Sequence, residues 1–338
     1  MMSRPLHALK HVAAMLCLVA SQPRDVHAAD MGADKPPIKN RAALVTPASQ
    51  SAALLAIQCA GERAVAVGDH GAVLLSDDKG ANWRQSRSVP SDVLLTGVSF
   101  VDAQHGWAVG HHGVVLHTED GGETWTLQRV DMQADKPLFA VHFFDQNTGV
   151  AVGLWSLVLR TVDGGAHWTE VTLAPTSDGA KSDLNLYSLF ADSHATLFAT
   201  SERGRVLRSM DQGATWEIIL TGNAGSLWTG TALTTDGSLV VAGLRGALLR
   251  SVDRGTTWQR MKLPLNESIA GLASLGSDRL IAVGDDGLVL KSGDGRSKFS
   301  AELRADRIAL TGIVAGACAS AETPIGLSLT GPVLLGKQ

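Results

Sequence analysis

The sequence has few of the features that bind nucleic acid or insert into membranes. Its 338 residues carry 29 Lys/Arg against 33 Asp/Glu, a formal net charge of −4, and no stretch gathers basic residues. A nucleic-acid partner is therefore not expected, because such surfaces need clustered positive charge. The only pronounced apolar run, VAAMLCLVA at 12–20, is far shorter than the ~20 residues of a bilayer span. The chain is not expected to span a membrane.

That short apolar run has the flanks of an export signal. Arg4 and Lys10 precede it, and small residues follow it, so that cleavage after Ala28 or Ala29 is favoured. This arrangement predicts a signal peptide over residues 1–28 and a periplasmic or secreted mature protein. The alternative is a buried N-terminal helix.

Cysteine and tyrosine are scarce, but glycine is abundant, with 36 residues. Five of the glycines recur at one position of a repeated octapeptide, and residues 292–299 (SGDGRSKF) are a degraded sixth copy. The five copies are SDDKGANW (76–83), TEDGGETW (118–125), TVDGGAHW (161–168), SMDQGATW (209–216) and SVDRGTTW (251–258).

Each octapeptide belongs to a longer repeat of about 40 residues. Three short apolar strand patterns precede it and a fourth begins at its tryptophan, as in LTGVSF (95–100), GWAVG (106–110) and VVLHT (114–118) of one unit. Short alternating runs separated by Gly and Asp are typical of hairpins. Seven such units predict an all-β, seven-bladed β-propeller of four-stranded antiparallel blades. A β-solenoid would need shorter and more uniform coils.

The seventh unit shows only three strand patterns, whereas an extra apolar stretch, RAALVTP (41–47), precedes the first unit. A closed ring leaves no exposed sheet edges. We therefore expect residues 41–47 to supply the outermost strand of the last blade and close the ring. The predicted organisation is a flexible leader over 29–40 and a propeller over 41–338.

Ring closure would make the first and seventh units neighbours, and each holds one of the two cysteines left after signal removal, Cys59 and Cys318. Cys59 ends the innermost strand of its unit, whereas Cys318 falls in the turn after the innermost strand. The difference in register disfavours a disulfide between them.

The octapeptides predict hairpin turns between third and fourth strands. The aspartate side chain can accept backbone N–H groups of its own turn, and the glycine supplies a positive φ. The tryptophan is expected to pack between blades, since five of the eight tryptophans occupy this one position. The predicted turn residues are Asp78, Asp120, Asp163, Asp211 and Asp253, with Trp83, Trp125, Trp168, Trp216 and Trp258.

The octapeptide resembles the Asp-box, or BNR repeat, of sialidase-like propellers. The longer unit VGHHGVVLHTEDGGETW (109–125) is similar to repeats of the photosystem II stability and assembly factor family, and the resemblance covers about residues 41–338. It implies an exported, non-enzymatic scaffold that binds a protein client such as a membrane or envelope protein. No cofactor is expected. An assembly or stability role for a membrane complex follows from the same resemblance.

The alternative is a carbohydrate-active propeller, either a sialidase-type glycoside hydrolase or a glycan-binding protein. A sialidase needs a Tyr–Glu pair, an acid/base Asp and three arginines. The only tyrosine, Tyr187, lies in an inner-strand pattern in register with Phe139 and Trp228. Arg160, Arg208, Arg250, Lys291 and His117 share one register before the turn; we interpret them as contacts to the neighbouring blade, with an anion site as the alternative.

The turns between second and third strands vary from unit to unit, as in DHG (69–71), HHG (111–113) and LWS (154–156). Residues that vary on a repeated scaffold are free to specify a partner. Adjacent turn histidines rarely reach one ion together, so a metal is not expected. The predicted partner-binding residues are Trp155, Arg203, Arg245, His111 and His112.

Overall fold

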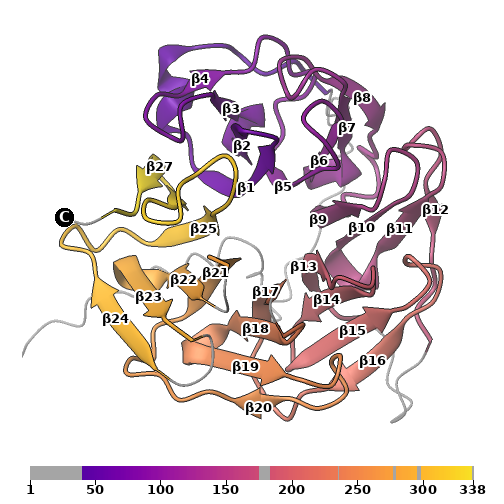
Figure 1. Ribbon diagram of the computed structural model, residues 1–338. Coiled ribbons are helices and arrows are strands. Elements are labelled where there is room, and N and C mark those ends of the chain that lie inside the picture. Colours follow the sequence, from indigo (N-terminus) through magenta and orange to yellow (C-terminus); the bar gives the residue numbers. More distant parts are fainter. Residues whose placement is uncertain (1–39, 175–182, 235, 277–278, 295–297, 337–338) are drawn as a thin grey trace, which may run out of the picture. The chain divides into compact units, whose positions relative to one another are not determined.

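The computed structural model describes residues 40–174, 183–234, 236–276, 279–294 and 298–336. Over these residues seven small antiparallel sheets are arranged around a central axis (Figure 1). The predicted seven-bladed, all-β propeller is confirmed, with six four-stranded blades and a seventh that has three strands within the described part of the chain. The predicted signal peptide and most of the leader lie outside the described residues.

The strands of each blade follow one another in sequence from the centre outward. Blade 1 holds β1 (Leu54–Ala60), β2 (Arg63–Gly68), β3 (Val73–Ser76) and β4 (Arg84–Gln85). Blade 2 holds β5 (Leu95–Phe100), β6 (Gly106–Gly110), β7 (Val115–Thr118) and β8 (Thr126–Arg129). Blade 3 holds β9 (Leu138–Phe143), β10 (Gly149–Gly153), β11 (Val158–Thr161) and β12 (Thr169–Glu170). Blade 4 holds β13 (Leu186–Ala191), β14 (Leu197–Ser201), β15 (Arg205–Ser209) and β16 (Glu217–Leu220).

The remaining blades repeat this pattern until the last. Blade 5 holds β17 (Leu227–Ala232), β18 (Leu239–Gly243), β19 (Ala247–Ser251) and β20 (Gln259–Arg260). Blade 6 holds β21 (Ile269–Ser274), β22 (Leu280–Gly284), β23 (Leu288–Ser292) and β24 (Phe299–Leu303). Blade 7 holds β25 (Leu310–Val314), β26 (Ile325–Ser328) and β27 (Gly331–Leu334).

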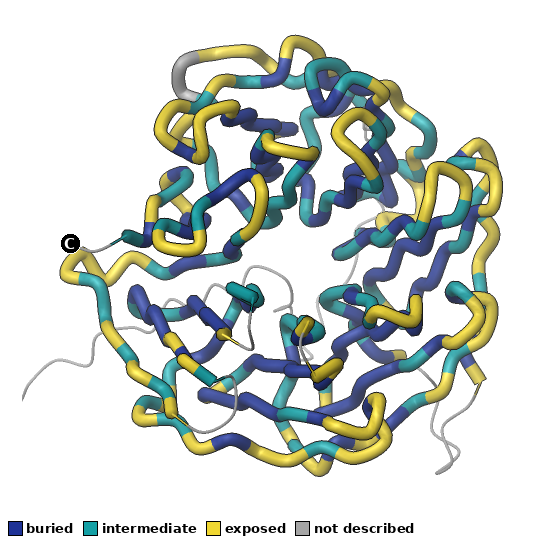
Figure 2. The backbone as a smooth tube through the Cα atoms, in the orientation of Figure 1, coloured by how far each residue is buried: buried dark blue, intermediate teal, exposed yellow. Residues whose placement is uncertain are grey.

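The second strands are buried on both faces, because each blade is covered by a neighbour on either side. Every residue of β6, β10, β14, β18 and β22 is buried. Figure 2 shows buried backbone through the middle of the blades and exposed backbone along the outer rim. This explains why the sequence of these strands is a continuous apolar run rather than an alternation.

The ring closes by direct packing of blade 7 on blade 1. The Thr311 hydroxyl of β25 donates to the Leu54 carbonyl of β1 at 2.6 Å. Cys59 and Cys318 form a disulfide across the same seam, with their Cα atoms 5.3 Å apart. The prediction that their registers disfavour a disulfide was therefore wrong. The turn after β25 folds back onto the end of β1, and the Cys318 N–H donates to the Cys59 sulfur at 3.3 Å.

The N-terminal segment lies elsewhere than expected. The stretch 41–47 forms no strand in the described structure, and blade 7 consists there of β25, β26 and β27 alone. Instead the Ala43 N–H donates to the Val89 carbonyl at 3.0 Å, and the Asn40 amide donates to the Pro90 carbonyl at 2.8 Å. The segment therefore packs on the connection from blade 1 to blade 2, and closure by an N-terminal strand is not observed.

The described helices are single short 3-10 turns, such as η2 (Pro47–Ser51) and η4 (His111–Gly113). Within the described ranges, none is long and apolar enough to span a bilayer.

Candidate functional site

In blades 1 to 6, the turn after the second strand holds a non-glycine residue in the left-handed conformation. The turns include η3 (Asp69–Gly71), η4, η5 (Leu154–Ser156), η6 (Leu244–Gly246) and η7 (Asp285–Gly287). We call their central residues, with the equivalent Arg203 of blade 4, the turn ring. Its members are His70 (φ 52°), His112 (54°), Trp155 (53°), Arg203 (57°), Arg245 (56°) and Asp286 (58°).

A repeated backbone hydrogen bond fixes these turns beside the connections between blades. In blade 3 the Leu154 N–H donates to the Pro137 carbonyl, the residue just before the first strand, at 3.1 Å. The same bond recurs as Asp69 to Ala53, His111 to Leu94, Glu202 to Asn185, Leu244 to Ser226 and Asp285 to Ser268. The turn ring and the blade connections therefore share one face.

The left-handed conformation of the turn ring carries a conformational cost. A residue with a Cβ is disfavoured there by roughly 1–2 kcal/mol, and bulky side chains are unusual in it. The following residue is also left-handed, and in blade 3 it is Ser156 (φ 60°) where the other turns have glycine. A large side chain held at a strained turn is an observation that points toward function rather than folding.

Trp155 is the largest side chain of the turn ring and is 63% exposed. Its backbone N–H is held by the Asn185 side chain at 3.2 Å, and the Ser156 hydroxyl accepts the Leu184 N–H at 2.9 Å. These contacts fix the turn and leave the indole accessible. The sequence also allows a second interpretation, in which the Trp155 indole folds back onto the loop 172–185 and belongs to the core. That loop includes residues 175–182, which lie outside the described ranges.

The other predicted binding residues differ in accessibility. Arg245 is exposed, and Arg203 is half-exposed with its guanidinium 3.7 Å from the Asp183 carboxylate. His112 is largely covered and pairs with Asp135 at 3.0 Å. Burial lowers the pKa of His111, although the nearby Asp135 carboxylate acts in the opposite direction and raises it. Trp155 and the two arginines therefore present more surface to a partner than the histidine pair does.

A second set of residues lies where the sequence alone does not identify a site. In the first strand of every blade, a β-bulge shifts the pairing with the second strand. The second residue of the first strand falls at this bulge and is skipped by the register. A bulge redirects the side chain of the extra residue. We call these residues, which lie at the entry of the innermost strands, the bulge ring. Its members are Leu55, Thr96, Phe139, Tyr187, Trp228, Ala270 and Thr311.

The bulge ring connects neighbouring blades around the centre. Thr96 donates its hydroxyl to the Leu138 carbonyl of blade 3 at 2.6 Å, as Thr311 does to Leu54. The Phe139 and Tyr187 rings stack with centroids 6.2 Å apart. The three aromatic members occupy blades 3 to 5, the blades that also present Trp155, Arg203 and Arg245. Blades 3 to 5 of the propeller therefore combine aromatic side chains of the bulge ring with aromatic and basic side chains of the turn ring.

The octapeptide aspartates accept hydrogen bonds from their own turns. Asp120 Oδ1 accepts the Thr118 hydroxyl and the Thr124 N–H, each at 2.9 Å, and Oδ2 accepts the Thr124 hydroxyl at 2.7 Å. Equivalent bonds surround Asp78, Asp163, Asp211 and Asp253. Hydrogen bonds from His167 and Thr257 lower the pKa values of Asp163 and Asp253 to about 2. The carboxylates are held charged within the turns.

The octapeptide tryptophans lie between blades. The Trp125 Nε1–H donates to the Gly122 carbonyl at 3.0 Å, and the ring packs in one cluster with Val65 and Leu75 of blade 1. Trp83, Trp216 and Trp258 make the same bond to the glycine carbonyl of their own turns. Trp168 packs in a cluster with residues of blade 2, without that bond. Each octapeptide thus attaches its blade to the preceding one.

Two of the basic residues that share the register before the octapeptides, Arg160 and Arg208, join blades as well, whereas Arg250 bonds Ser238 and Asp236 of its own blade. Arg160 Nε–H donates to the Gln212 carbonyl in the turn of blade 4 at 2.9 Å, and Arg208 donates to the Arg254 carbonyl in the turn of blade 5 at 2.9 Å. These arginines bind the next blade's turn, and this geometry favours the inter-blade interpretation over an anion site. Among the described residues, no group of three or more His, Cys, Asp or Glu side chains could hold a metal.

Comparisons with known proteins agree with the repeat analysis. Residues 84–246 match the family model of the photosynthesis system II assembly factor YCF48. Comparison with curated protein sequences gives no match. A solved YCF48 bound to D1 peptide is similar, with a TM-score of 0.69 and 20% identity over 87% of this chain and 95% of the other.

Two further solved structures share the architecture. YCF48 from Cyanidioschyzon merolae has a TM-score of 0.66 and 16% identity, over 87% of this chain and 98% of its own. The GH74 enzyme of Niastella koreensis has a TM-score of 0.63 and 16% identity, over 84% of this chain and 52% of its own. At these identities the structural likeness concerns the fold alone.

Proposed function

We propose that this chain, a propeller of the photosystem II assembly factor-like family, binds an extended segment of a protein client on the face that carries the turn ring. The observation that carries the proposal is Trp155, which is 63% exposed at a strained turn position. Exposed tryptophan and arginine side chains are the usual anchors of protein interfaces. The role is that of an exported, non-enzymatic assembly or stability factor for a membrane or envelope complex.

Two observations support this proposal. The similar YCF48 structure contains a D1 peptide, so a propeller of this kind can take a protein segment as its ligand. The Cys59–Cys318 disulfide is of the sort that persists in oxidising compartments, which supports export. Arg203 and Arg245 favour a client segment that carries acidic residues, since complementary charge speeds and orients association.

The test is capture of client proteins by the mature chain from its native envelope fraction, followed by affinity measurement with the captured client. Trp155→Ala and the double variant Arg203→Ala/Arg245→Ala should each weaken binding by about tenfold or more. Met210→Ala is the matched control, because Met210 is an exposed large side chain in an octapeptide turn, away from the turn ring. Wild-type affinity in both folded test variants would show that the client binds elsewhere.

The alternative is a carbohydrate-active propeller, which the likeness to the GH74 enzyme brings into consideration. A glycoside hydrolase needs two carboxylates roughly 5–10 Å apart across its cleft. The bulge ring lies at the entry of the innermost strands and has Leu, Thr, Phe, Tyr, Trp and Ala at its seven positions. These seven side chains therefore do not supply the two carboxylates. Release of reducing sugar from oligosaccharides by the purified mature chain would favour the hydrolase and contradict the non-enzymatic role.

A further inference from the structure

Blade 7 ends in an edge strand, β27, that no described strand covers. Its sheet consists of β25, β26 and β27, whereas every other blade has a fourth strand. The blades on either side of it, 6 and 1, end in β24 and β4 (Figure 1). Because neighbouring strands lie about 4.8 Å apart, the edge of β27 is set back by one strand spacing between these two outermost strands.

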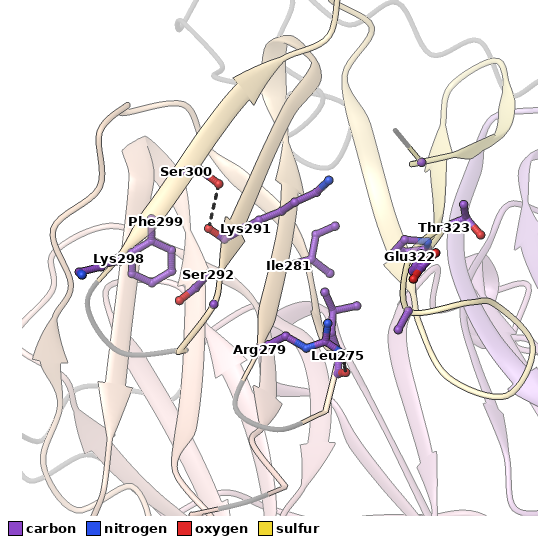
Figure 3. Close-up of a pocket in the computed structure, with 14 residues that line it drawn as sticks. Leu275, Arg279, Ile281, Lys291, Ser292, Lys298, Phe299, Ser300, Glu322 and Thr323 are labelled. Atoms are coloured by element: carbon purple, nitrogen blue, oxygen red, sulfur yellow. Dashed lines mark hydrogen bonds between the residues drawn. The ribbon is translucent and has the colours of Figure 1, made fainter. Parts of the chain in front are cut away.

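This edge is a separate feature from the pocket of about 840 Å³ that also borders blade 7 (Figure 3). Gly336 and the turn 321–324 line that pocket on the side of blade 7. The edge is formed instead by Pro332, Val333 and Leu334, which are not among the lining residues.

The register of β27 gives the backbone groups that face outward. The Leu335 N–H donates to the Pro324 carbonyl at 2.9 Å, and along an antiparallel pair the residues that bond the partner strand alternate with residues that face away. Val333 therefore bonds to β26, and Pro332 and Leu334 face outward. Pro332 offers only its carbonyl there, whereas Leu334 offers an N–H and a carbonyl. Within the described ranges, none of these three groups is hydrogen-bonded.

Other blades show what such an edge binds. The carbonyl that occupies the place of the Pro332 carbonyl accepts an N–H from the residue after the fourth strand in blades 1, 3 and 5. These bonds join Ser86 to Val73, Val171 to Val158 and Met261 to Leu248, each at 2.8 Å. The outward groups of β27 are therefore arranged as in blades that hold a fourth strand.

A matched pair of leucines shows the effect of the missing strand on side-chain burial. Leu75 of blade 1 and Leu334 of blade 7 occupy equivalent places in the register. Each lies against the octapeptide glycine of the next blade, Gly122 and Gly80 respectively. Leu75 is opposite Arg84 of a fourth strand and is 0% exposed, whereas Leu334 is 45% exposed. An apolar side chain is thus left partly in water where another strand would cover it.

We propose that the edge of β27 binds an extended segment of another protein, which pairs antiparallel to β27 as a fourth strand. The segment donates one N–H to the Pro332 carbonyl and exchanges two hydrogen bonds with Leu334. An apolar side chain opposite Leu334 covers its exposed part. The paired stretch is short, because Gln50 of η2 lies beside Gly331. The fourth strands of blades 1, 3 and 5 are also only two residues long.

A second copy and the predicted leader are both poorer occupants than another protein. The β27 edge of a second copy is also set back, so the flanking β24 and β4 strands would meet before the two edges could pair. The sequence of the leader, 29–39, contains Pro36 and Pro37, and its only large apolar residues are Met31 and Ile38. Proline has no N–H to donate to a strand. The occupant is therefore an extended, apolar segment of another chain.

The test uses a labelled, acetylated peptide VIILTG, which is the sequence 217–222 with valine in place of Glu217. In blade 4 this sequence contains the fourth strand, with residues 217 and 219 opposite the places that Leu334 and Pro332 occupy in blade 7. Fluorescence polarisation with the mature protein should give a Kd below about 1 mM. Backbone N-methylation then removes one N–H at a time without changing a side chain.

N-methylation of the first or the third peptide residue should weaken binding by about tenfold or more, because their N–H groups face β27. N-methylation of the second residue is the matched control and should have little effect, because its N–H points away. Equal binding by the three methylated peptides would overturn the proposal, as would the absence of binding by the unmodified peptide below about 1 mM.

Leu334→Pro tests the same bonds from the side of the protein. It removes an outward N–H and leaves the bonds to β26 in place, so peptide binding should weaken by about tenfold or more. Leu334→Ala, which keeps the N–H, is the matched control and should bind more tightly than Leu334→Pro. Wild-type affinity in a folded Leu334→Pro variant would overturn the proposal. If that variant does not fold, the methylated peptides still decide.

The other occupants have outcomes of their own. A dimer of the mature protein that Leu334→Pro dissociates would overturn the proposal in favour of a second copy. Tighter peptide binding after deletion of residues 29–39 would overturn it in favour of the leader. The inference does not rest on the turn ring, and Trp155→Ala should leave peptide binding unchanged, so its failure is distinguishable from failure of the turn-ring proposal.

Discussion

Cys59 at the end of the first blade's innermost strand is disulfide-bonded to Cys318 in the seventh blade, across 259 residues of sequence. The bond joins the two blades that meet where the ring closes, so it converts a non-covalent seam into a covalent one. Ile325 and Leu327 pack near the same seam with Trp83. Closure therefore rests on apolar packing, the Thr311–Leu54 hydrogen bond and this disulfide.

Removal of the disulfide should lower stability strongly. A crosslink that closes a loop of this length is worth on the order of 3–5 kcal/mol, mainly through the unfolded chain. The double variant Cys59→Ser/Cys318→Ser should therefore unfold at a clearly lower temperature than the oxidised wild type. Intact mass of the wild type should rise by about 2 Da on reduction.

Reduced wild type is the control for that experiment, because it has both sulfurs but no bond. Its melting temperature should match that of the double serine variant. Equal melting temperatures for oxidised wild type and the variant would mean that seam packing alone closes the ring.

Loss of an octapeptide carboxylate should destabilise the fold. Asp120→Ala removes the acceptor of three hydrogen bonds and leaves the Thr124 N–H without its partner, at a cost of about 1–3 kcal/mol. Chemical denaturation should show a lower midpoint. Client binding should be unaffected, because the turn lies away from the turn ring; loss of binding with an unchanged midpoint would assign the octapeptide a functional role instead.

Much of the fold could be predicted because the same strand and turn patterns recur in several units of the sequence. The Asp and Trp of the octapeptide gave the blade boundaries and the packing of the tryptophans between blades, and the structure adds that each packs on the preceding blade. The disulfide could not be predicted, because the bend that returns Cys318 to β1 is an irregular turn that occurs once. The position of residues 40–43 was also missed, since an apolar stretch can pack on a connection as well as join a sheet.

The candidate site was predictable only in part. The variable turns between second and third strands gave Trp155, Arg203 and Arg245, but not the left-handed conformation that all six turns share. The bulge ring was invisible because a bulge changes pairing without changing the apolar pattern. Tyr187, for example, has the sequence context of an ordinary inner-strand residue.

Acid should destabilise the protein in two steps. Burial lowers the pKa of His142 to about 4, so the unfolded chain takes up this proton more readily, and stability should fall from about pH 6.5 to about pH 4. His111 and His117, whose pKa values burial also lowers, act in the same direction. The octapeptide aspartates have lowered pKa values, so their contribution is lost below about pH 4.

The first step can be assigned by substitution. His142→Leu should flatten the melting temperature between pH 6.5 and 4 relative to wild type, while leaving the loss below pH 4 unchanged. His194→Leu, at an exposed histidine, is the control and should follow the wild-type curve. An undiminished first step in His142→Leu would show that the other histidines dominate it.

Trp155 offers a direct test of whether its strained turn is retained for binding. Asparagine tolerates the left-handed conformation better than tryptophan does. Trp155→Asn should therefore keep or raise the melting temperature, by the equivalent of up to ~1 kcal/mol, because little packing is lost from a side chain that is 63% exposed. The same variant should weaken client binding by about tenfold or more. A gain in stability with loss of binding would show that the turn keeps tryptophan for its partner. A marked loss of stability would instead assign the indole to the core, and the binding face would then have to be sought elsewhere on the ring.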